Sequence, residues 1–232
     1  MTNGQHHAVS REGAPTSEAV EDYAKAIFTL ERRTGEAVAT SALAERLRVS
    51  PASVTAMLKR MDEMNLVSHE PYHGVTLTRA GERVALEVIR HHRLLESYLA
   101  DALGMPWDRV HDEAEVLELY ISEELEERIA SALGDPSRDP HGDPIPDREL
   151  GLATERGVPL VELRPGDSGV FSRVSDSDPA MLRYLAERGI RPGAAITVTE
   201  RQPFGGPLFV AVEDDTHAIG GELAERILIA SK

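Results

Sequence analysis

The sequence contains no cysteine among its 232 residues. Disulfide bonds, thiolate metal ligands and thiol nucleophiles are therefore excluded, and a cytoplasmic location is expected. Aromatic side chains are also scarce, at 4%, which disfavours the binding of single-stranded nucleic acid by base stacking. No apolar run approaches the roughly 18 residues of a transmembrane helix, so we expect no membrane partner. The stretch MTNGQHHAVSREGAPTS lacks the layout of a signal peptide, and residues 1–15 are expected to form a disordered tail.

Positive charge is also in short supply, because 25 Lys and Arg residues stand against 40 Asp and Glu residues, for a net charge of −15. Residues 81–150 hold 7 basic and 18 acidic residues, a balance of −11, whereas residues 1–80 hold 9 and 10, a balance of −1. The acidity as a whole disfavours contact with nucleic-acid phosphates, but the near-neutral first part can still carry a basic face. The acidic middle part is either a solvated surface or a binding site for a cation.

The near-neutral part is patterned as a DNA-binding domain over residues 16–78. Apolar spacing predicts a helix over residues 17–33, a short helix in SALAERLR, and another helix from Pro51 to about Met64. Two short helices joined by a tight turn form a helix-turn-helix, and the alternating stretch LVSHEPYHGVTLT predicts a two-stranded wing after it. We therefore expect a winged helix-turn-helix.

The second helix of this pair carries the side chains expected of a recognition helix. Hydroxyl and ammonium groups can reach base edges and phosphates, and alanine allows close approach and contact with a thymine methyl group. The candidate residues for contact with double-stranded DNA are Ser50, Ala52, Ser53, Thr55 and Lys59. Pairs of short helices also occur in all-α proteins that do not bind DNA, but the wing favours DNA binding.

The middle of the chain is expected to form a helical dimerisation and metal-binding domain over residues 79–147. Helices are predicted over residues 79–103 and 111–133, each closed by a glycine. The stretch DPSRDPHGDPIPD (135–147) contains four prolines and no periodicity, so it is interpreted as a linker at a domain boundary.

Short β-type runs separated by glycine and proline dominate the last part of the chain. They include VELRPGDSGVFSRV, AITVTE, PLFVAV and AERILIA, with one short helix in SDPAMLRYLAERG. We expect a linker over residues 148–159 and a small SH3-like β-barrel over residues 160–232. The predicted fold class is therefore mainly α with a small β-barrel.

Helical spacing places possible metal ligands on a common face of the acidic helix. At 100° per residue, His111, Glu115 and Glu118 fall on one narrow strip beside an apolar stripe. The other acids of this helix, Glu126 among them, are interpreted as solvated surface. The strip therefore lies at the edge of a face that we expect to be buried.

The preceding helix repeats the pattern, because His92 and Glu96 are one turn apart. Such groups are more often solvated or ion-paired than they are metal ligands, but their presence on two adjacent helices makes the two interpretations about equal. Oxygen and nitrogen ligands without sulfur suit Mn²⁺, Fe²⁺ or Zn²⁺, and many carboxylates favour Mn²⁺.

Five motifs together resemble those of the diphtheria toxin repressor family: EDYAKAIFTL, VSPASVTAMLKRM, RHHRLLESYL, HDEAEVLE and DPHGDPIP. The resemblance covers residues 17–230, and the chain looks most like the manganese transport regulators that keep a C-terminal SH3-like (FeoA-like) domain. It implies a metal-activated, homodimeric repressor that binds a palindromic operator.

The resemblance also implies two metal sites. For the primary site, the matching positions are Asp22, Glu115 and Glu118. For the ancillary site, the matching positions are His92, Glu96, His111 and, from the barrel, Asp176. Iron-sensing members have methionine and cysteine where this chain has Asp22 and Glu115, so the carboxylates are those of a manganese sensor.

The chain departs from the family pattern at two positions. Some manganese regulators have an acid three residues after the Asp22 position, where this chain has Lys25. The family usually has a histidine directly after the second glutamate, where this chain has Leu119. We expect water or a backbone carbonyl to complete the primary site in place of that histidine.

These observations predict a cytoplasmic, homodimeric repressor that is activated by Mn²⁺, with Fe²⁺ or another divalent metal as an alternative, and that controls metal-uptake genes. One alternative is a winged-helix regulator that has lost metal control. A metal-dependent hydrolase is a weaker alternative, because the sequence has neither a nucleophile elbow nor an HExxH motif. We therefore expect no enzymatic activity.

Overall fold

The computed structural model of the chain describes residues 17–70, 74–154 and 157–230. It divides into two compact units. The first comprises Met1–His92, Glu115–Ser131 and Pro146–Leu152, and the second comprises Arg93–Ala114, Ala132–Ile145 and Ala153–Lys232. The expected tail over residues 1–15 and the tip of the expected wing at residues 71–73 lie outside the described residues.

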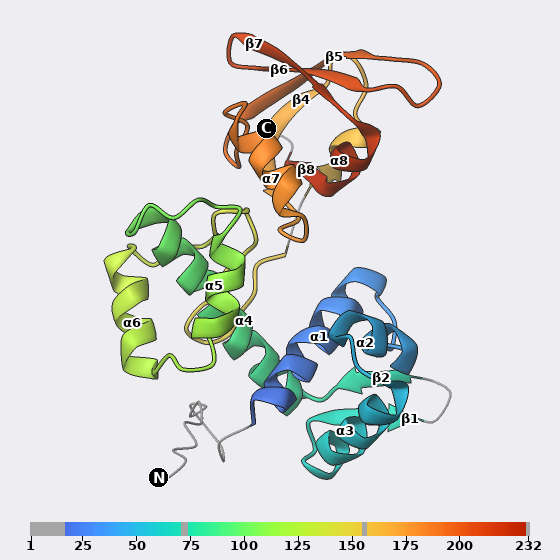
Figure 1. Ribbon diagram of the computed structural model, residues 1–232, viewed down its shortest axis with the longest axis vertical. Helices are drawn as coiled ribbons and strands as arrows, with labels where there is room; N and C mark the ends of the chain where they lie inside the picture. The colour runs from blue at the N-terminus through green and yellow to red at the C-terminus, as the bar shows by residue number, and fades with distance from the viewer. Residues whose placement is uncertain (1–16, 71–73, 155–156, 231–232) are drawn as a thin grey trace. The chain divides into compact units, whose positions relative to one another are not determined.

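The first unit opens with three helices and a hairpin (Figure 1). Their bounds are α1 Glu18–Thr34, α2 Thr40–Leu47, α3 Pro51–Glu63, β1 Val67–Glu70 and β2 Gly74–Leu77. Acids in the first turn of α1 complement the helix dipole, and Gly35 ends the helix with a left-handed φ of 70°. The predicted helices and hairpin are therefore present, with ends that differ by one or two residues.

Helix α3 forms because its first residues supply their own cap. The Ser50 hydroxyl accepts a hydrogen bond from the Ser53 N–H at 3.1 Å, and Pro51 occupies the first turn, where it leaves no N–H unpaired. Val54, Leu58 and Met61 recur on one face and are fully buried in the core that α3 shares with α1 and α2. The opposite face of α3 is left exposed.

The hairpin is joined to the helices by a third short pairing. Val67 pairs with Leu77 at its open end, and Val38, before α2, exchanges two backbone hydrogen bonds with Val75 at 2.8 and 2.9 Å. A Cβ on Gly81 would lie 1.9 Å from the Leu66 carbonyl oxygen, so the helix that follows the hairpin approaches it at a position that admits only glycine. That helix is α4, Arg79–Asp101, which runs from the first unit into the second.

The prediction of one helix over residues 111–133 is wrong. Two helices are present, α5 Val110–Leu117 and α6 Glu123–Ala132, separated by a turn over residues 118–122. Ser122 starts the second helix: its carbonyl oxygen accepts from the Glu126 N–H at 2.9 Å and its hydroxyl accepts from the Leu125 N–H at 3.3 Å. The turn therefore shifts the buried face, and a single helical wheel does not describe both halves.

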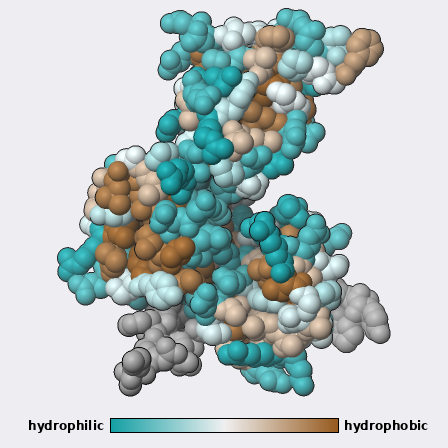
Figure 2. Space-filling model, viewed as in Figure 1, coloured by the Kyte–Doolittle hydropathy of each residue, from teal (hydrophilic) through white to brown (hydrophobic). Residues whose placement is uncertain are grey.

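Glu126 shows the consequence of this shift. It was predicted to be solvated, but it is 2% exposed and lies between Arg90 and His91 of α4, at 2.6 and 3.0 Å. Val116, Leu117 and Leu125 are instead exposed, and Figure 2 shows hydrophobic side chains gathered on the surface over α5 and α6. This part of the first unit therefore presents an apolar surface.

The prediction of a linker over residues 135–147 is also wrong, because most of this segment is packed. Residues 141–146 are all buried, and the side chain of Asp139 accepts the N–H groups of His141 and Asp143, each at 2.9 Å. Proline lacks an N–H, so a segment without periodicity can be buried once its remaining backbone groups are bonded in this way.

The second unit contains a six-stranded antiparallel sheet in the order β3-β8-β4-β5-β6-β7. The bounds are β3 Val158–Pro159, β4 Ser168–Val174, β5 Ala195–Arg201, β6 Leu208–Val212, β7 Asp215–Ile219 and β8 Ile227–Ala230. The short helices are η1 Leu160–Glu162, α7 Pro179–Ala186 and α8 Gly221–Arg226. Phe171 lies fully buried in the core.

Within residues 157–230 no pairing joins β3 to β7, so closure of the expected barrel is not confirmed. None of the helices among the described residues combines the length and apolar character that a bilayer crossing needs.

Candidate metal centre and nucleic-acid interface

The exposed face of α3 carries the residues predicted to contact DNA. Ala52, Ser53, Thr55 and Lys59 are all exposed, as is Ser50 at the helix start. In the free protein three hydroxyls are bonded locally, because the hydroxyls of Ser50 and Ser53 bond each other and that of Thr55 donates to the Pro51 carbonyl oxygen at 3.0 Å. Binding to bases would have to exchange these local hydrogen bonds for new ones.

Charge around α3 is positive although the chain is acidic. Residues 40–60 contain Arg46, Arg48, Lys59 and Arg60 but only one acid, Glu45. Both basic residues of α3 are exposed and lie on its second half, while the helix dipole adds a partial positive charge at its first turn. This local excess suits contact with phosphates.

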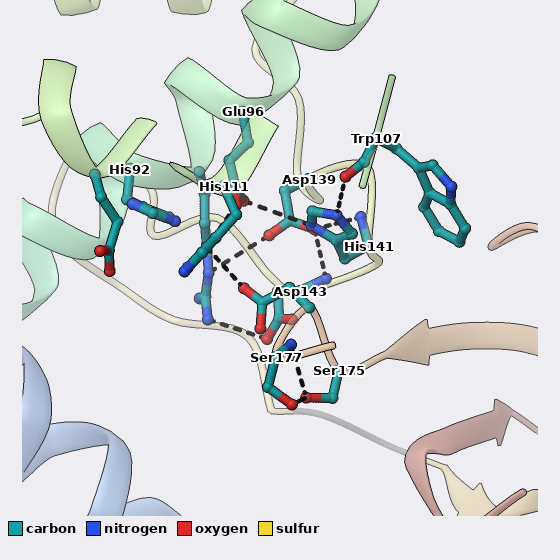
Figure 3. Close-up of polar contacts among 12 residues, drawn as sticks. His92, Glu96, Trp107, His111, Asp139, His141, Asp143, Ser175 and Ser177 are labelled. Carbon is teal, nitrogen blue, oxygen red and sulfur yellow. Dashed lines mark hydrogen bonds and ion pairs between the residues drawn. The ribbon is translucent and has the colours of Figure 1, made fainter. Parts of the chain in front are cut away.

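A cluster in the second unit joins three residues that the sequence singled out. His111, which lies beside Glu96 in Figure 3, has its Nδ1 3.2 Å from Glu96 Oε1 and 3.1 Å from Asp176 Oδ2. Glu96 is 1% exposed and comes from α4, His111 comes from α5, and Asp176 follows β4. His92 belongs to the same group through α4, on whose preceding turn it lies. These residues form what we call the Glu96 cluster.

Sequence reasoning missed two further members of the cluster, Asp139 and His141. His141 is fully buried, and its Nε2 lies 2.8 Å from the Trp107 carbonyl oxygen. Because a carbonyl can only accept, Nε2 carries the proton, and Nδ1 then faces Glu96 Oε2 at 3.7 Å. Among the described residues Nδ1 has no hydrogen-bond partner. The only signal in the sequence was a histidine set among acids in DPHGD.

Proton affinities in the Glu96 cluster are strongly shifted. Hydrogen bonds to Asp176 and Glu96 raise the pKa of His111 to about 10. Burial opposes charge on His141, but Glu96 and Asp139 outweigh it and raise its pKa to about 9. Burial would raise the pKa of Asp176, yet the hydrogen bond from His111 lowers it to about 2. Both imidazoles are thus protonated at neutral pH in the metal-free chain.

The Glu96 cluster fits a divalent cation. Its donors are imidazole nitrogens and carboxylate oxygens, including the buried His141 Nδ1, which has no hydrogen bond among the described residues. Its two protons could be exchanged for one doubly charged ion. The chain has no cysteine, which excludes a thiolate site.

A second cluster, in the first unit, contains the residues predicted to form the primary site. Lys25 Nζ lies 2.9 and 3.0 Å from the two carboxylate oxygens of Glu118 and 3.9 Å from Glu115 Oε1. His92 Nδ1 lies 2.5 Å from Glu118 Oε2 and 3.2 Å from Lys25 Nζ. Partial burial and then Glu118 raise the pKa of Asp22 to about 6, while Lys25 opposes them. We call this group the Lys25 cluster.

The Lys25 cluster does not fit a divalent cation as it stands. The carboxylate of Glu118, which is 4% exposed, is already engaged by an ammonium on both oxygens. Leu119 lies partly buried in the turn after α5 and offers no donor or acceptor. A second positive charge would have to be accommodated beside the first.

Three family models match consecutive parts of the chain. They are described as "Iron dependent repressor, N-terminal DNA binding domain" over residues 15–75, "Iron dependent repressor, metal binding and dimerisation domain" over residues 78–147, and "FeoA domain" over residues 158–231. The order of the matches agrees with the resemblance noted in the sequence.

Curated relatives match over most of their length. The chain is 32% identical to the iron-dependent repressor IdeR of Mycobacterium tuberculosis over 221 residues, which cover 90% of this chain and 95% of that protein. It is 36% identical to the diphtheria toxin repressor of Corynebacterium diphtheriae over 191 residues, which cover 78% and 84%.

Solved structures of metal-dependent repressors also match most of the chain. A manganese-dependent transcriptional repressor in complex with manganese matches with a TM-score of 0.84 and 42% identity, over 92% of this chain and all of that one. The structure of ScaR with bound Zn²⁺ matches with a TM-score of 0.75 and 28% identity, over 92% and 99%.

Proposed function

The chain belongs to the family of iron- and manganese-dependent transcriptional repressors, and from that premise we propose that it is a homodimeric repressor activated by Mn²⁺ at the Glu96 cluster. That family consists of DNA-binding metalloregulators rather than enzymes, and no hydrolase is proposed. Within the proposal, the winged helix-turn-helix binds a palindromic operator of metal-uptake genes, and the SH3-like domain, taken as a barrel, supplies Asp176. The proposed domain bounds stay at residues 16–78, 79–147 and 160–232.

The observation that carries the proposal is the geometry around Glu96. Imidazole and carboxylate groups from α4, α5, the segment 135–147 and the strand end after β4 converge on one buried carboxylate. The proposed ligands are His92, Glu96, His111, His141 and Asp176. When bound, the ion supplies two positive charges that replace protons on the imidazoles.

The chemistry of these donors supports Mn²⁺ among divalent ions. A mixture of two carboxylates with imidazoles and no thiolate suits a hard or borderline ion of high coordination number. Zn²⁺ prefers a compact tetrahedron rich in nitrogen and sulfur. The iron-dependent relatives make Fe²⁺ the competing ion for this site.

Metal control requires only that the ion binds the DNA-competent state more tightly than the alternative. A hundredfold preference corresponds to about 2.7 kcal/mol, which a few ligands can supply. The apolar surface over α5 and α6, with Val116 and Leu117 exposed, is the proposed dimer contact. A twofold dimer would place its recognition helices in successive major grooves, about 34–36 Å apart.

The test is selection of duplexes from a random-sequence library, with Mn²⁺ or with a chelator, by the wild-type chain and by Glu96→Gln. We expect enrichment of an inverted repeat by the wild type only when Mn²⁺ is present, and loss of that enrichment in the variant. Enrichment that is equal with Mn²⁺ and with chelator would reject metal activation and favour a winged-helix regulator without metal control.

A further inference from the structure

The ammonium group of Lys25 is held as a bound cation would be held. It is within 3.0 Å of both oxygens of Glu118 and within 3.2 Å of His92 Nδ1, and Glu115 approaches to 3.9 Å. Only 19% of the Lys25 side chain is exposed, and Glu118 and His92 are 3% and 6% exposed at their side chains. A lysine that reaches so deep needs a strong partner, because an unpaired buried charge is costly.

The groups around this ammonium are the ones that a divalent ion would need at the same place. A metal bound to Glu118 would have to use the same carboxylate oxygens, one of which also lies 2.5 Å from His92 Nδ1. Coordination distances are about 2.0–2.2 Å, so the ion would occupy the space beside Nζ and meet its charge at close range. The ammonium and a metal ion therefore exclude each other.

Because Lys25 belongs to the chain itself, its ammonium group is always present in the Lys25 cluster. Lys25 lies one turn after Asp22 on α1, whereas Glu118 follows α5 and His92 comes from α4. A tethered group has a high effective concentration at its site, and it joins these three elements without any ion. Leu119 is consistent with this arrangement, because a cluster that binds an ammonium has no need of another imidazole ligand.

We infer that Lys25 is a built-in cation that replaces the divalent ion among Asp22, His92, Glu115 and Glu118. Of the two metal sites that the family resemblance implies, only the Glu96 cluster then holds an ion, and Lys25 holds α1 against the turn after α5 in the absence of metal. This inference rests on the proposed function, in which the Glu96 cluster binds Mn²⁺, but the two can fail separately.

The experiment begins from a background in which the Glu96 cluster is disabled by Glu96→Gln and His111→Gln. Into it we place Lys25→Glu, or Arg33→Glu as a matched control, since Arg33 is exposed on the same helix and the change in charge is equal. Mn²⁺ binding is measured by calorimetric titration and by the paramagnetic resonance signal of free Mn²⁺. We expect one ion per chain with Lys25→Glu, bound on the order of a hundredfold more tightly than by the background or the control, in which binding should be too weak to detect.

Three outcomes bear on the inference. If the background itself binds one Mn²⁺ and loses it on Glu118→Gln, the metal displaces the lysine and the inference is wrong. If Lys25→Glu gains no ion, the surrounding groups do not form a cation site, and the inference is again wrong. If the wild type binds no ion but Lys25→Glu gains one, the inference stands and the proposed function fails.

A folding defect is recognised separately. Circular dichroism and thermal unfolding are recorded for each variant, and Lys25→Met keeps the apolar stem of the side chain while it removes the charge. In the same background, Lys25→Met should bind Mn²⁺ more tightly than the background and more weakly than Lys25→Glu. Binding no stronger than that of the background, in a folded variant, would count against the inference.

Discussion

The protonation of His111 and His141 sets the charge of the Glu96 cluster in the metal-free chain. The pKa of His111 is raised from 6.5 to about 10 and that of His141 to about 9, so both rings carry a proton at neutral pH. Groups with raised pKa values contribute stability that is fully present below about pH 6.5 and is lost as the pH rises through 9 to 10. A metal ion that uses these nitrogens has to displace their protons.

We therefore expect Mn²⁺ binding at pH 7 to release about two protons per ion. The measurement is calorimetric titration in buffers of different ionisation enthalpy. Affinity should continue to rise with pH up to about 9, rather than level off just above the ordinary histidine pKa of about 6.5. An observed enthalpy that is independent of the buffer would contradict the assignment of these rings as ligands.

His141 is predicted to be a ligand in its own right. Replacing it with glutamine keeps a polar group of similar reach but removes the ring nitrogen aimed at Glu96. We expect Mn²⁺ affinity to fall by roughly ten- to a hundredfold, as for loss of a ligand or of a group that orients one. His217→Gln on β7, at a partly buried position outside the Glu96 cluster, is the control, with affinity unchanged, and an equal loss in both variants would point to a general defect.

At this scale the sequence predicted some members of the site and missed others. The spacing of His92 and Glu96 and the motif around His111 could be recognised because helices fix side-chain directions. Asp139 and His141 lie in a proline-rich segment, where no periodicity indicates direction. The contact between Lys25 and Glu118 joins residues 93 positions apart in the chain, which no local pattern encodes.

Among the elements, α4 and α6 are joined by a buried ion pair. Arg90 donates to Glu126 at 2.6 Å and to the Pro146 carbonyl oxygen at 2.6 Å. Burial would raise the pKa of Glu126, but His91 and Arg90 lower it below its ordinary value. Its contribution to stability is therefore present at neutral pH and is lost as the pH falls through the lowered value.

Glu126→Gln should lower the free energy of unfolding by about 3 kcal/mol, because it leaves the buried guanidinium of Arg90 without a counter-charge. Glu124→Gln is the control on the same helix, where the pair with Arg128 is exposed and is worth about 0.5 kcal/mol or less. The measurement is urea unfolding of both variants without metal at pH 7. Equal losses would show that burial does not distinguish the two pairs.

The helices of the first unit were predictable because each carries its own signals, such as the Ser50 cap and Pro51 of α3. The break between α5 and α6 was not, since the apolar spacing continues through it. Ser122 caps α6 there, but serine also occurs inside helices. Among the strands, β7 was missed because DTHAI has few of the apolar residues that reveal a buried strand.

At the scale of the whole molecule, the acidic excess lies in residues 81–150, whereas α2 and α3 carry a local excess of basic residues. A protein of net charge −15 can therefore approach DNA with this helix pair. Lys59→Ala should weaken binding to all sequences and reduce the salt slope by about 1, if Lys59 meets one phosphate. Thr55→Ala should instead change the base preference. Fluorescence anisotropy at several salt concentrations measures both effects, and unchanged binding by both variants would contradict the assignment of α3 as the recognition helix.

The lysine in place of an ion also determines what the protein can sense. An ammonium on a side chain is present in fixed amount, so its occupancy carries no information about the supply of metal in the cell. A dimer with one metal-responsive site per chain binds two ions, whereas a dimer with two such sites per chain binds four. Its DNA occupancy can then rise with free Mn²⁺ with a Hill coefficient of at most about 2. Such a regulator gives a graded response over a wide range of metal concentration, where a fully metallated relative would switch sharply.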